Sequence, residues 1–318
     1  MAEAIATCRA AGIRVVMITG DYPSTARAVA GEVGIGAAAV VTGDEIAAMS
    51  DAALDAALAR ADVFARVRPE QKLRLVAALE RGGRIVAMTG DGVNDAPALK
   101  AAHVGIAMGR HGAEVAREVA ALVLLRDDFT PIVSAIRQGR RIHANLMQAL
   151  GYTVAVHLPM IAAVMVPALA GWPAMLAPLH IVSLQLVIDP ACSLVFENEP
   201  ARADAMRVPP RPPHARLWAS PLIARGAAAG VVGLYALLLA RGGDPAFART
   251  AAFVALVSAN VALIFVVRAL AGGARASGPF AGNRYLWIVP ACAASALLAL
   301  LSIPPLASLF GLVPLLAR

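Results

Sequence analysis

Cysteine, aromatic residues and charged residues are all scarce in this sequence of 318 residues. Its three cysteines, Cys8, Cys192 and Cys292, are far apart and share no metal-ligand spacing. This distribution argues against a disulfide framework and favours small buried side chains. The net charge is +7, but no stretch interleaves basic residues with aromatic residues, which make up 5% of the chain. We therefore expect no nucleic-acid partner.

Charged residues are missing above all from the second half of the chain. They make up 15% of the whole, against 59% hydrophobic residues, and the mean hydropathy is +0.69. A soluble globular protein is typically about half apolar and about a quarter charged. Residues 1–145 carry ordinary charge, whereas the remainder consists of long apolar runs. This division predicts a soluble domain and then a membrane domain, which we place at 1–130 and 131–318.

Short apolar runs alternate with amphipathic segments through the first of these domains. We expect strands at 13–18, 40–41, 63–65, 84–88, 104–108 and 121–125. We expect helices at 2–11, 23–33, 45–49, 51–60 and 69–81, and from residue 96. Such alternation predicts an α/β domain in which helices cover both faces of a parallel sheet. In these sheets ligands bind where the strands end at their carboxyl edge.

The densest polar motif is T-G-D-G-V-N-D-A-P-A-L, at residues 89–99. Asp91 and Asp95 lie on either side of a turn that opens into a helix, and this spacing can aim both carboxylates at one Mg²⁺ ion. Gly90 and Gly92 allow backbone amides to approach a phosphate, helped by the positive end of the following helix, and Asn94 adds a neutral donor. A lone D-G-x-N-D would equally describe a solvated turn with an N-cap aspartate. The whole string favours a metal and phosphate site.

Two further segments place polar groups at the same expected edge of the sheet. Lys72 lies at the start of the helix at 69–81, where a lysine is usually only a solvated charge. If the sheet forms as predicted, its ammonium group reaches the edge and neutralises phosphoryl oxygens. Thr19-Gly20-Asp21 supplies a hydroxyl group and amides at the end of another strand. Together these residues predict a phosphoryl-transfer site that lacks its nucleophile.

Four strings make this pattern specific. They are M-I-T-G-D at 17–21, F-A-R-V-x-P-x-x-K at 64–72, M-T-G-D-G-V-N-D-A-P-A-L-K at 88–100 and V-G-I-A-M-G at 104–109. With them the chain resembles the phosphorylation domain and following membrane helices of P-type cation-transporting ATPases, within the haloacid-dehalogenase-like superfamily. The similarity continues through Asp127-Asp128-Phe129 and the membrane half. It implies a partial haloacid-dehalogenase-like, Rossmann-like domain followed by an all-α transmembrane bundle.

The resemblance also implies roles for the residues at the sheet edge. Asp91 would coordinate Mg²⁺, and Asp95 would support the metal and its neighbours. The other residues of the implied catalytic set would hydrogen-bond the phosphoryl oxygens, balance their charge or lie beside them: Thr19, Gly20, Asp21, Lys72 and Asn94. The ATP that such a pump uses would be bound mainly by a separate nucleotide-binding domain.

The nucleophile of the family is the aspartate of a D-K-T-G-T motif, and this sequence contains no such motif. The sequence also shows no actuator domain with a T-G-E loop, no nucleotide-binding domain and no first four membrane helices. Nucleophilic catalysis needs the atom that forms the covalent intermediate. We therefore expect the chain to be the C-terminal portion of a pump, a truncated or split-gene product that is inactive without the missing N-terminal part.

Five apolar runs have the length that a bilayer requires of a helix. We expect membrane spans at 146–169, 176–196, 220–240, 247–267 and 285–303. The gaps at 197–219 and 268–284 are rich in arginine, namely Arg202, Arg207, Arg211, Arg216, Arg268, Arg275 and Arg284. Because basic loops face the cytoplasm, the N-terminal domain should be cytoplasmic. The protein should then lie in a bacterial plasma membrane as a multi-pass protein.

Polar residues within these spans are candidates for the transported metal cation, because burying them in lipid is costly without a purpose. Asp189 is an ion ligand or else a structural partner of Gln185 or Asn260. His157 is equally open to ligation and to helix packing, whereas Met160 favours packing and Asn260 favours an interhelical hydrogen bond. Against calcium pumps, Asp189 falls on an ion-binding aspartate and Gln185 on a neighbouring amide position. His157 and Met160 fall where those pumps carry an asparagine and a glutamate. The string H-I-V-x-L-x-L-V-I-D-P at 180–190 is closer to a bacterial branch of cation pumps.

The sequence leaves three hypotheses for the function of the chain. The first is ATP-driven cation transport through an aspartyl-phosphate cycle, completed by the rest of a pump. The second is a non-catalytic membrane protein that binds or regulates an intact pump, although such a protein would not need the metal and phosphate residues. The third, a phosphatase that uses water directly, is disfavoured because the nucleophile is missing.

Overall fold

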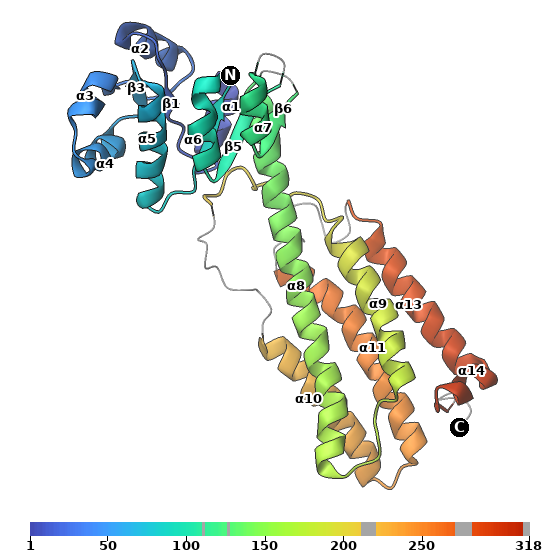
Figure 1. Cartoon of the computed structure of the whole chain (residues 1–318). Helices are drawn as coiled ribbons and strands as arrows, with labels where there is room; N and C mark the ends of the chain where they lie inside the picture. Colours follow the sequence, from blue (N-terminus) through green and yellow to red (C-terminus); the bar gives the residue numbers. More distant parts are fainter. Residues whose placement is uncertain (110–111, 126–127, 211–220, 271–281, 314–318) are drawn as a thin grey trace. The chain divides into compact units, whose positions relative to one another are not determined.

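The structure, a computed structural model, describes residues 1–109, 112–125, 128–210, 221–270 and 282–313. Four residues named above lie outside these ranges: Asp127, Arg211, Arg216 and Arg275. The chain forms two compact units, shown in Figure 1. The first comprises Met1–Arg137 with Asp204–Arg211, and the second comprises Gln138–Ala203 with Pro212–Arg318.

The first unit alternates short strands with helices. Its helices are α1 (Ala2–Ala10), α2 (Pro23–Glu32), α3 (Gly43–Ala48), α4 (Asp51–Arg60), α5 (Pro69–Arg81), the 3₁₀ helix η1 (Val93–Asp95), α6 (Ala96–Ala101) and α7 (Glu114–Val119). Its strands are β1 (Met17–Ile18), β2 (Val40–Thr42), β3 (Val63–Ala65), β4 (Ala87–Gly90), β5 (Val104–Met108) and β6 (Leu122–Leu124). The expected α/β alternation is confirmed.

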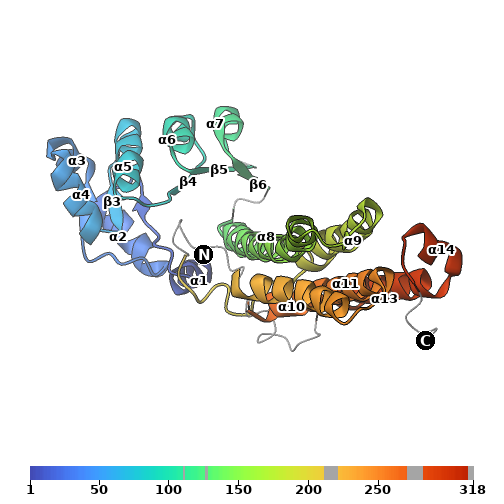
Figure 2. The ribbon, with the colours of Figure 1, turned by 90° about the horizontal axis from the view of Figure 1, so that it is seen from below.

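The strands form two parallel three-stranded sheets instead of the single sheet that the sequence predicted. One has the order β1-β3-β2 and the other β4-β5-β6. Val63 of β3 lies opposite both Met17 and Val40, so β3 is central in the first sheet. Within the described residues, β1 and β4 each pair on one side only, so both are edge strands. Figure 2 shows α5, α6 and α7 along one side of these strands.

Two strands are shorter or later than their apolar runs suggested. The run at 13–18 pairs only from Met17, and the strand expected at 84–88 begins at Ala87. Ile85 is 72% exposed, and the pairing of β4 with β5 begins only at Ala87. Pairing, which joins segments distant in the sequence, therefore decides where these strands begin.

The helices of this unit begin where capping chemistry places them. The side chain of Thr42 accepts a hydrogen bond from the backbone of Glu45, whose carboxylate accepts from the Thr42 backbone in return. This capping box satisfies amides that the first turn of α3 would leave unpaired. The hydrogen bond from the Thr42 backbone also lowers the pKa of the Glu45 carboxyl. Prolines occupy the first turns of α2 and α5, where their missing N–H costs nothing.

The segment Asp204–Arg211 joins the first unit through one buried side chain. Met206 packs in a cluster with Cys8 and Ala11 of the α1 region and with Val133. Pro209 lies against Gly12, where a Cβ atom would stand 2.8 Å from the Pro209 Cα. Gly12 also has a φ of 72°, so two constraints select glycine there.

The second unit consists of helices. They are α8 (Thr130–Ala170, shared with the first unit), α9 (Pro178–Pro190), the π-helix η2 (Ala191–Phe196), α10 (Pro221–Ala240), α11 (Pro245–Leu270), α13 (Tyr285–Ser302) and α14 (Pro304–Leu309). Within the described residues, five helices are long and apolar enough to cross a membrane. Their number agrees with the five predicted spans, although α8 runs well beyond the predicted 146–169.

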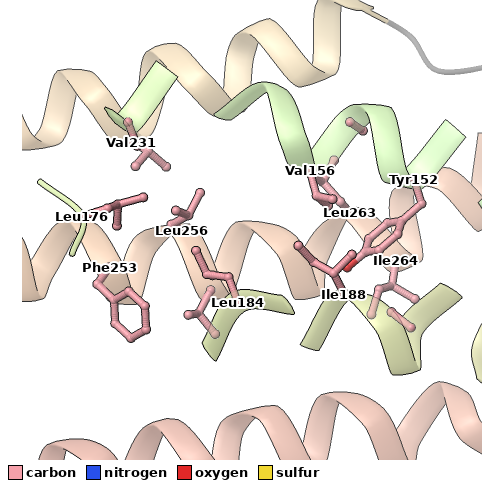
Figure 3. Close-up of a cluster of buried hydrophobic side chains, with 14 of the residues drawn as sticks. Tyr152, Val156, Leu176, Leu184, Ile188, Val231, Phe253, Leu256, Leu263 and Ile264 are labelled. Atoms are coloured by element: carbon pink, nitrogen blue, oxygen red, sulfur yellow. The ribbon is translucent and has the colours of Figure 1, made fainter. Parts of the chain in front are cut away.

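The membrane helices share one apolar core, part of which Figure 3 shows. Tyr152 and Val156 come from α8, Ile188 from α9, Val231 from α10 and Leu256 from α11. All five are less than 5% exposed. Helices at membrane depth associate through such close packing, because lipid provides little hydrophobic drive between them.

His180 links the start of α9 to the chain after α14 through hydrogen bonds. Its Nδ1 accepts a hydrogen bond from the Ala177 backbone at 3.0 Å, so its Nε2–H donates to the Phe310 carbonyl at 2.7 Å. The ring also lies 4.8 Å from the Phe253 ring and 6.0 Å from the Phe310 ring, measured between centroids. The imidazole is fully buried.

We expect His180→Ala to lower the stability of the folded chain by about 2–4 kcal/mol, since it removes two buried hydrogen bonds and the ring contacts. Thermal unfolding in detergent measures this as a fall in the midpoint of roughly 5–10 °C. His143→Ala is the matched control, because that side chain is exposed on α8. Equal midpoints for the two variants would contradict the expectation.

Candidate functional site

The loop after β4 holds an ion pair between two of the predicted site residues. Asp95 ends η1 and is 6% exposed. Its Oδ1 accepts a hydrogen bond from the Lys72 Nζ of α5 at 2.5 Å. The side chains of Lys72 and Asp95 are 18% and 8% exposed, so water screens the pair only weakly. Charge-assisted hydrogen bonds of this kind are strong, and this one ties the loop to α5.

Gly90 allows Asp95 to lie against the end of β4. A Cβ atom on Gly90 would stand 2.6 Å from the Asp95 Cβ and 3.0 Å from its Oδ2. A Cβ atom on Gly92 would meet nothing closer than 3.8 Å. The two glycines of the motif therefore differ, because only Gly90 is required by close packing against Asp95.

Asp91 and Asn94 lie at the surface beside this pair. Both are exposed, and among the described residues neither side chain has a hydrogen-bond or ion-pair partner. The backbone carbonyl of Asp91 accepts from the Ala113 amide at 2.7 Å, which holds the turn in place. The Asp91 carboxylate is therefore fixed at its backbone and open to a ligand.

Thr19 and Asp21 form a turn of their own at the end of β1. The Thr19 hydroxyl donates to Asp21 Oδ2 at 2.9 Å and accepts from the Asp21 amide at 3.1 Å. The Arg66 and Val67 amides donate to the carbonyls of Asp21 and Thr19, so the turn is bound to the end of β3. Arg66 has a φ of 54°, a left-handed conformation that costs a side chain energy.

The structure thus assembles the predicted residues in two groups. Lys72, Asp95 and Asp91 belong to the end of β4, whereas Thr19 and Asp21 belong to the end of β1. Within the described residues, no hydrogen bond or ion pair joins one group to the other. Each group ends an edge strand of a different sheet.

The donor set after β4 fits magnesium. Mg²⁺ prefers oxygen ligands, binds through one or two carboxylates plus phosphate, and keeps several waters. Asp91 offers an exposed carboxylate, while Asp95 has Oδ1 engaged by Lys72 and Oδ2 beside Gly90. In the described part of the chain, no three His, Cys, Asp or Glu side chains converge into a cage. The arrangement therefore suits a metal that shares a phosphate ligand better than a permanently caged ion.

In the membrane unit, the predicted cation residues lie on two helices, α8 and α9. Asp189 is exposed on α9, and Gln185 is half-buried on the same helix. The Gln185 Oε1 is buried without a hydrogen-bond partner in the described part of the chain. His157 Nδ1 lies 2.7 Å from the Thr153 carbonyl of its own helix, so that nitrogen is already engaged. The Asp189 carboxylate is thus exposed, and the Gln185 Oε1 accepts no hydrogen bond from the described residues. One ring nitrogen of His157 is already bonded.

Asn260 departs from the sequence expectation. Its side chain is fully buried on α11, yet neither its Oδ1 nor its Nδ2 has a partner among the described residues. The Tyr152 hydroxyl of α8 instead donates an interhelical hydrogen bond to the Asn260 backbone carbonyl, at 3.3 Å. The prediction that the Asn260 amide joins two helices is therefore wrong. An unpaired buried amide is costly to the fold.

Gln148 on α8 belongs with these amides and was missed by sequence reasoning. Its Oε1 is also buried without a partner among the described residues. The available signal was a polar residue within an apolar helix, but the residue lies at the edge of the span expected at 146–169. Only the packed structure shows that its oxygen is shielded from water.

Separate parts of the chain match two different family models. Residues 1–103 match the family model for haloacid dehalogenase-like hydrolases, and residues 173–318 match the model for the C-terminus of cation transporting ATPases. A probable cation-transporting ATPase F of Mycobacterium tuberculosis is 39% identical over 326 residues, covering 99% of this chain and 36% of that protein. A calcium-transporting ATPase of Bacillus subtilis is 36% identical over 324 residues, covering 98% of this chain and 36% of that protein.

A pump named for sodium and potassium matches as well. The sodium/potassium-transporting ATPase subunit alpha of Drosophila melanogaster is 40% identical over 241 residues, covering 66% of this chain and 23% of that protein. The chain spans about a third of the length of the two bacterial relatives, at 36% of each. Relatives named for different cations thus match this chain.

Proposed function

The chain belongs to the P-type cation-transporting ATPase family, and from this we propose that it supplies two parts of an ATP-driven cation pump. One part is the magnesium and phosphate edge of the phosphorylation domain, and the other is the set of membrane helices that carry the cation. The observation that supports this most is the Lys72–Asp95 pair beside the open carboxylate of Asp91. In the part of the chain that the structure describes, five helices are long and apolar, and three of them carry a buried amide group with an atom that has no hydrogen-bond partner there.

The phosphorylated aspartate would come from the rest of the pump. This sequence has no D-K-T-G-T motif, while β1 and β4 each leave one edge unpaired in the described structure. We propose that a further parallel strand bearing that aspartate pairs with these edges. Its carboxylate would attack the terminal phosphorus of ATP, forming an aspartyl phosphate and releasing ADP. Without that strand the chain would not pump, because no other group forms the covalent intermediate.

The residues at the strand ends then have distinct tasks. Lys72 would oppose the negative charge of the phosphoryl oxygens, and Asp95 would hold its ammonium group in place. The Thr19 hydroxyl and the amides of Gly20 and Asn94 would donate to those oxygens. Asp91 would hold Mg²⁺, which supplies positive charge to the phosphoryl group when it is bound.

The cation would pass beside α9. Asp189 is the charged candidate, and Gln185 adds a buried oxygen without a partner. His157 has only its second nitrogen available, so it would act through that atom. The protein is a multi-pass membrane protein, and we place its first unit on the cytoplasmic side of a bacterial plasma membrane. The basic residues Arg202, Arg207 and Arg284, between the spans, support that orientation.

Transport by a chimaera tests this function. The full chain would replace the matched segment of the Bacillus subtilis calcium-transporting ATPase, and ATP-dependent uptake of Ca²⁺ and other cations into vesicles would be measured. We expect uptake with wild-type chain and a loss of at least about tenfold with Asp189→Asn, since removing a charged ligand costs more than about 1.4 kcal/mol. Glu197→Gln is the control, because Glu197 is exposed on the same segment.

The chimaera must first be shown to fold, by monodisperse elution in detergent. A folded chimaera that hydrolyses no ATP and moves no cation would oppose the proposed function. Unchanged uptake with Asp189→Asn would remove Asp189 from the cation path while leaving the phosphorylation proposal standing.

A further inference from the structure

Glu199, just after η2, is a buried acid that joins several helices. It is 4% exposed. Its Oε1 accepts a hydrogen bond from the Arg268 Nε of α11 at 2.7 Å. Its Oε2 accepts from the Asn283 Nδ2 at 3.0 Å, just before α13. The carboxylate therefore connects the end of the α9–η2 segment to two further helices.

The backbone of Glu199 connects the same segment to α8. Its carbonyl accepts from the Arg141 Nε at 2.8 Å and from the Asn145 Nδ2 at 2.9 Å. Asn145 also donates to the Glu197 carbonyl at 3.1 Å, and Asn283 donates to the Val195 carbonyl at 2.7 Å. Donors from three other segments thus converge on the few residues that end η2.

The charges in this cluster are shielded from solvent. The side chains of Arg268 and Glu199 are 4% and 5% exposed, less than those of any other ion pair in the described structure. Burying two charges is expensive, and an apolar pair of similar size often gives equal or greater stability. A buried pair that holds one defined geometry is therefore better explained by positioning than by stability alone.

The stretch between Glu199 and the cation candidates is irregular. Pro190 lacks the N–H that would continue α9, and the next six residues form the π-helix η2. Such turns depart from ordinary helix geometry and occur often at functional sites. Regular α-helical hydrogen bonds therefore do not continue through to the cytoplasmic end of this segment. They do not fix the rotation of α9 about its axis. That rotation depends on where the end is held.

We propose that Glu199 is a positioning residue that sets the direction in which Asp189 and Gln185 face. Its bonds to α8, α11 and α13 fix the end of η2, and η2 transmits that placement to α9. The functional meaning of this inference rests on the proposed cation pathway. The geometric claim can be tested on the chain alone.

The test uses the full chain in lipid nanodiscs, with its three cysteines replaced by alanine and a single Asp189→Cys reporter. The measurements are the rate of maleimide labelling at position 189 and the mobility of a spin label attached there. We expect Glu199→Gln to change the labelling rate by at least threefold and to broaden the distribution of label mobility. Glu197→Gln, in the same turn and exposed, should change neither.

A second variant separates positioning from folding. Glu199→Gln leaves Arg268 buried beside an uncharged partner, which destabilises the fold, whereas Glu199→Gln with Arg268→Met removes both charges. We expect the double variant to fold and still to show an altered labelling rate, because the ion pair that joins the end of η2 to α11 is gone. A folded double variant labelled at the wild-type rate would overturn the inference, whatever the single variant does.

A functional measurement in the chimaera, with Asp189 intact, completes the test. Positioning predicts that Glu199→Gln raises the cation concentration for half-maximal ATP hydrolysis at least fivefold, with the maximal rate largely kept. A fall in maximal rate at unchanged cation dependence would contradict the positioning role. If the wild-type chimaera fails to transport, the proposed function fails, and the labelling result still decides the geometric inference.

Discussion

Gly90→Ala is expected to break the Lys72–Asp95 ion pair, because the new methyl group occupies space that Asp95 now fills. The added Cβ would stand 2.6 Å from the Asp95 Cβ, which real contacts do not allow. Asp95 must therefore move away from β4, and its carboxylate leaves Lys72. Overpacking and the loss of a largely buried charge pair together should destabilise the unit by about 3 kcal/mol or more. In the chimaera, phosphorylation by ATP should fall by at least about a hundredfold, since Lys72 would no longer be held in place.

Gly92→Ala provides a matched control within the same loop. Its Cβ would meet nothing closer than 3.8 Å, an ordinary contact distance, and its φ is compatible with alanine. We expect its unfolding midpoint and its phosphorylation level to stay near those of the wild type. Thermal unfolding of the chain and phosphorylation with radiolabelled ATP would measure the two effects separately. A Gly90→Ala protein as stable and as readily phosphorylated as Gly92→Ala would show that Asp95 is not packed as described.

Local patterns in the sequence predicted the elements well. The strands expected at 63–65 and 104–108 have those bounds in the structure, because their apolar runs are short and end at turn residues. Five membrane spans were expected, and five suitable helices occur in the described residues. The division of the strands into two sheets was not predictable from such patterns. It depends on which distant strands pair, and alternation of strands and helices does not specify that.

The candidate site was partly predictable for a similar reason. The spacing of Asp91 and Asp95 predicted a metal and phosphate loop, but Lys72 pairs with Asp95 through packing of α5 that no local pattern encodes. Asn260 and Glu199 illustrate the limit in the membrane unit. An apolar helix with one amide does not reveal whether that amide is paired, and an acid after a span does not reveal its burial. Both facts depend on neighbouring helices.

The two Thr-Gly-Asp triplets look alike in sequence but present their aspartates differently. The Asp21 carboxylate accepts a hydrogen bond from Thr19 in its own turn, at 2.9 Å. The Asp91 carboxylate has no partner among the described residues. A carboxylate that is already bonded gives up that contact to bind a metal, whereas a free one does not. This difference assigns the two residues different expected roles in phosphorylation.

Asp91→Asn should therefore abolish the stimulation of phosphorylation by Mg²⁺, whereas Asp21→Asn should keep it. Asparagine keeps the shape of Asp91 but removes the charge that a hard cation prefers, so phosphorylation of the chimaera by ATP should fall by at least about a hundredfold. The free energy of unfolding of the Asp91→Asn variant should change by less than about 0.5 kcal/mol, because the Asp91 side chain is exposed and has no partner among the described residues. Asp21→Asn weakens the turn at β1, so it should lower the phosphorylation rate without moving the Mg²⁺ concentration for half-maximal effect. Titration of phosphorylation with Mg²⁺ for both variants distinguishes these cases, and a shift confined to Asp21→Asn would place the metal at the end of β1 instead.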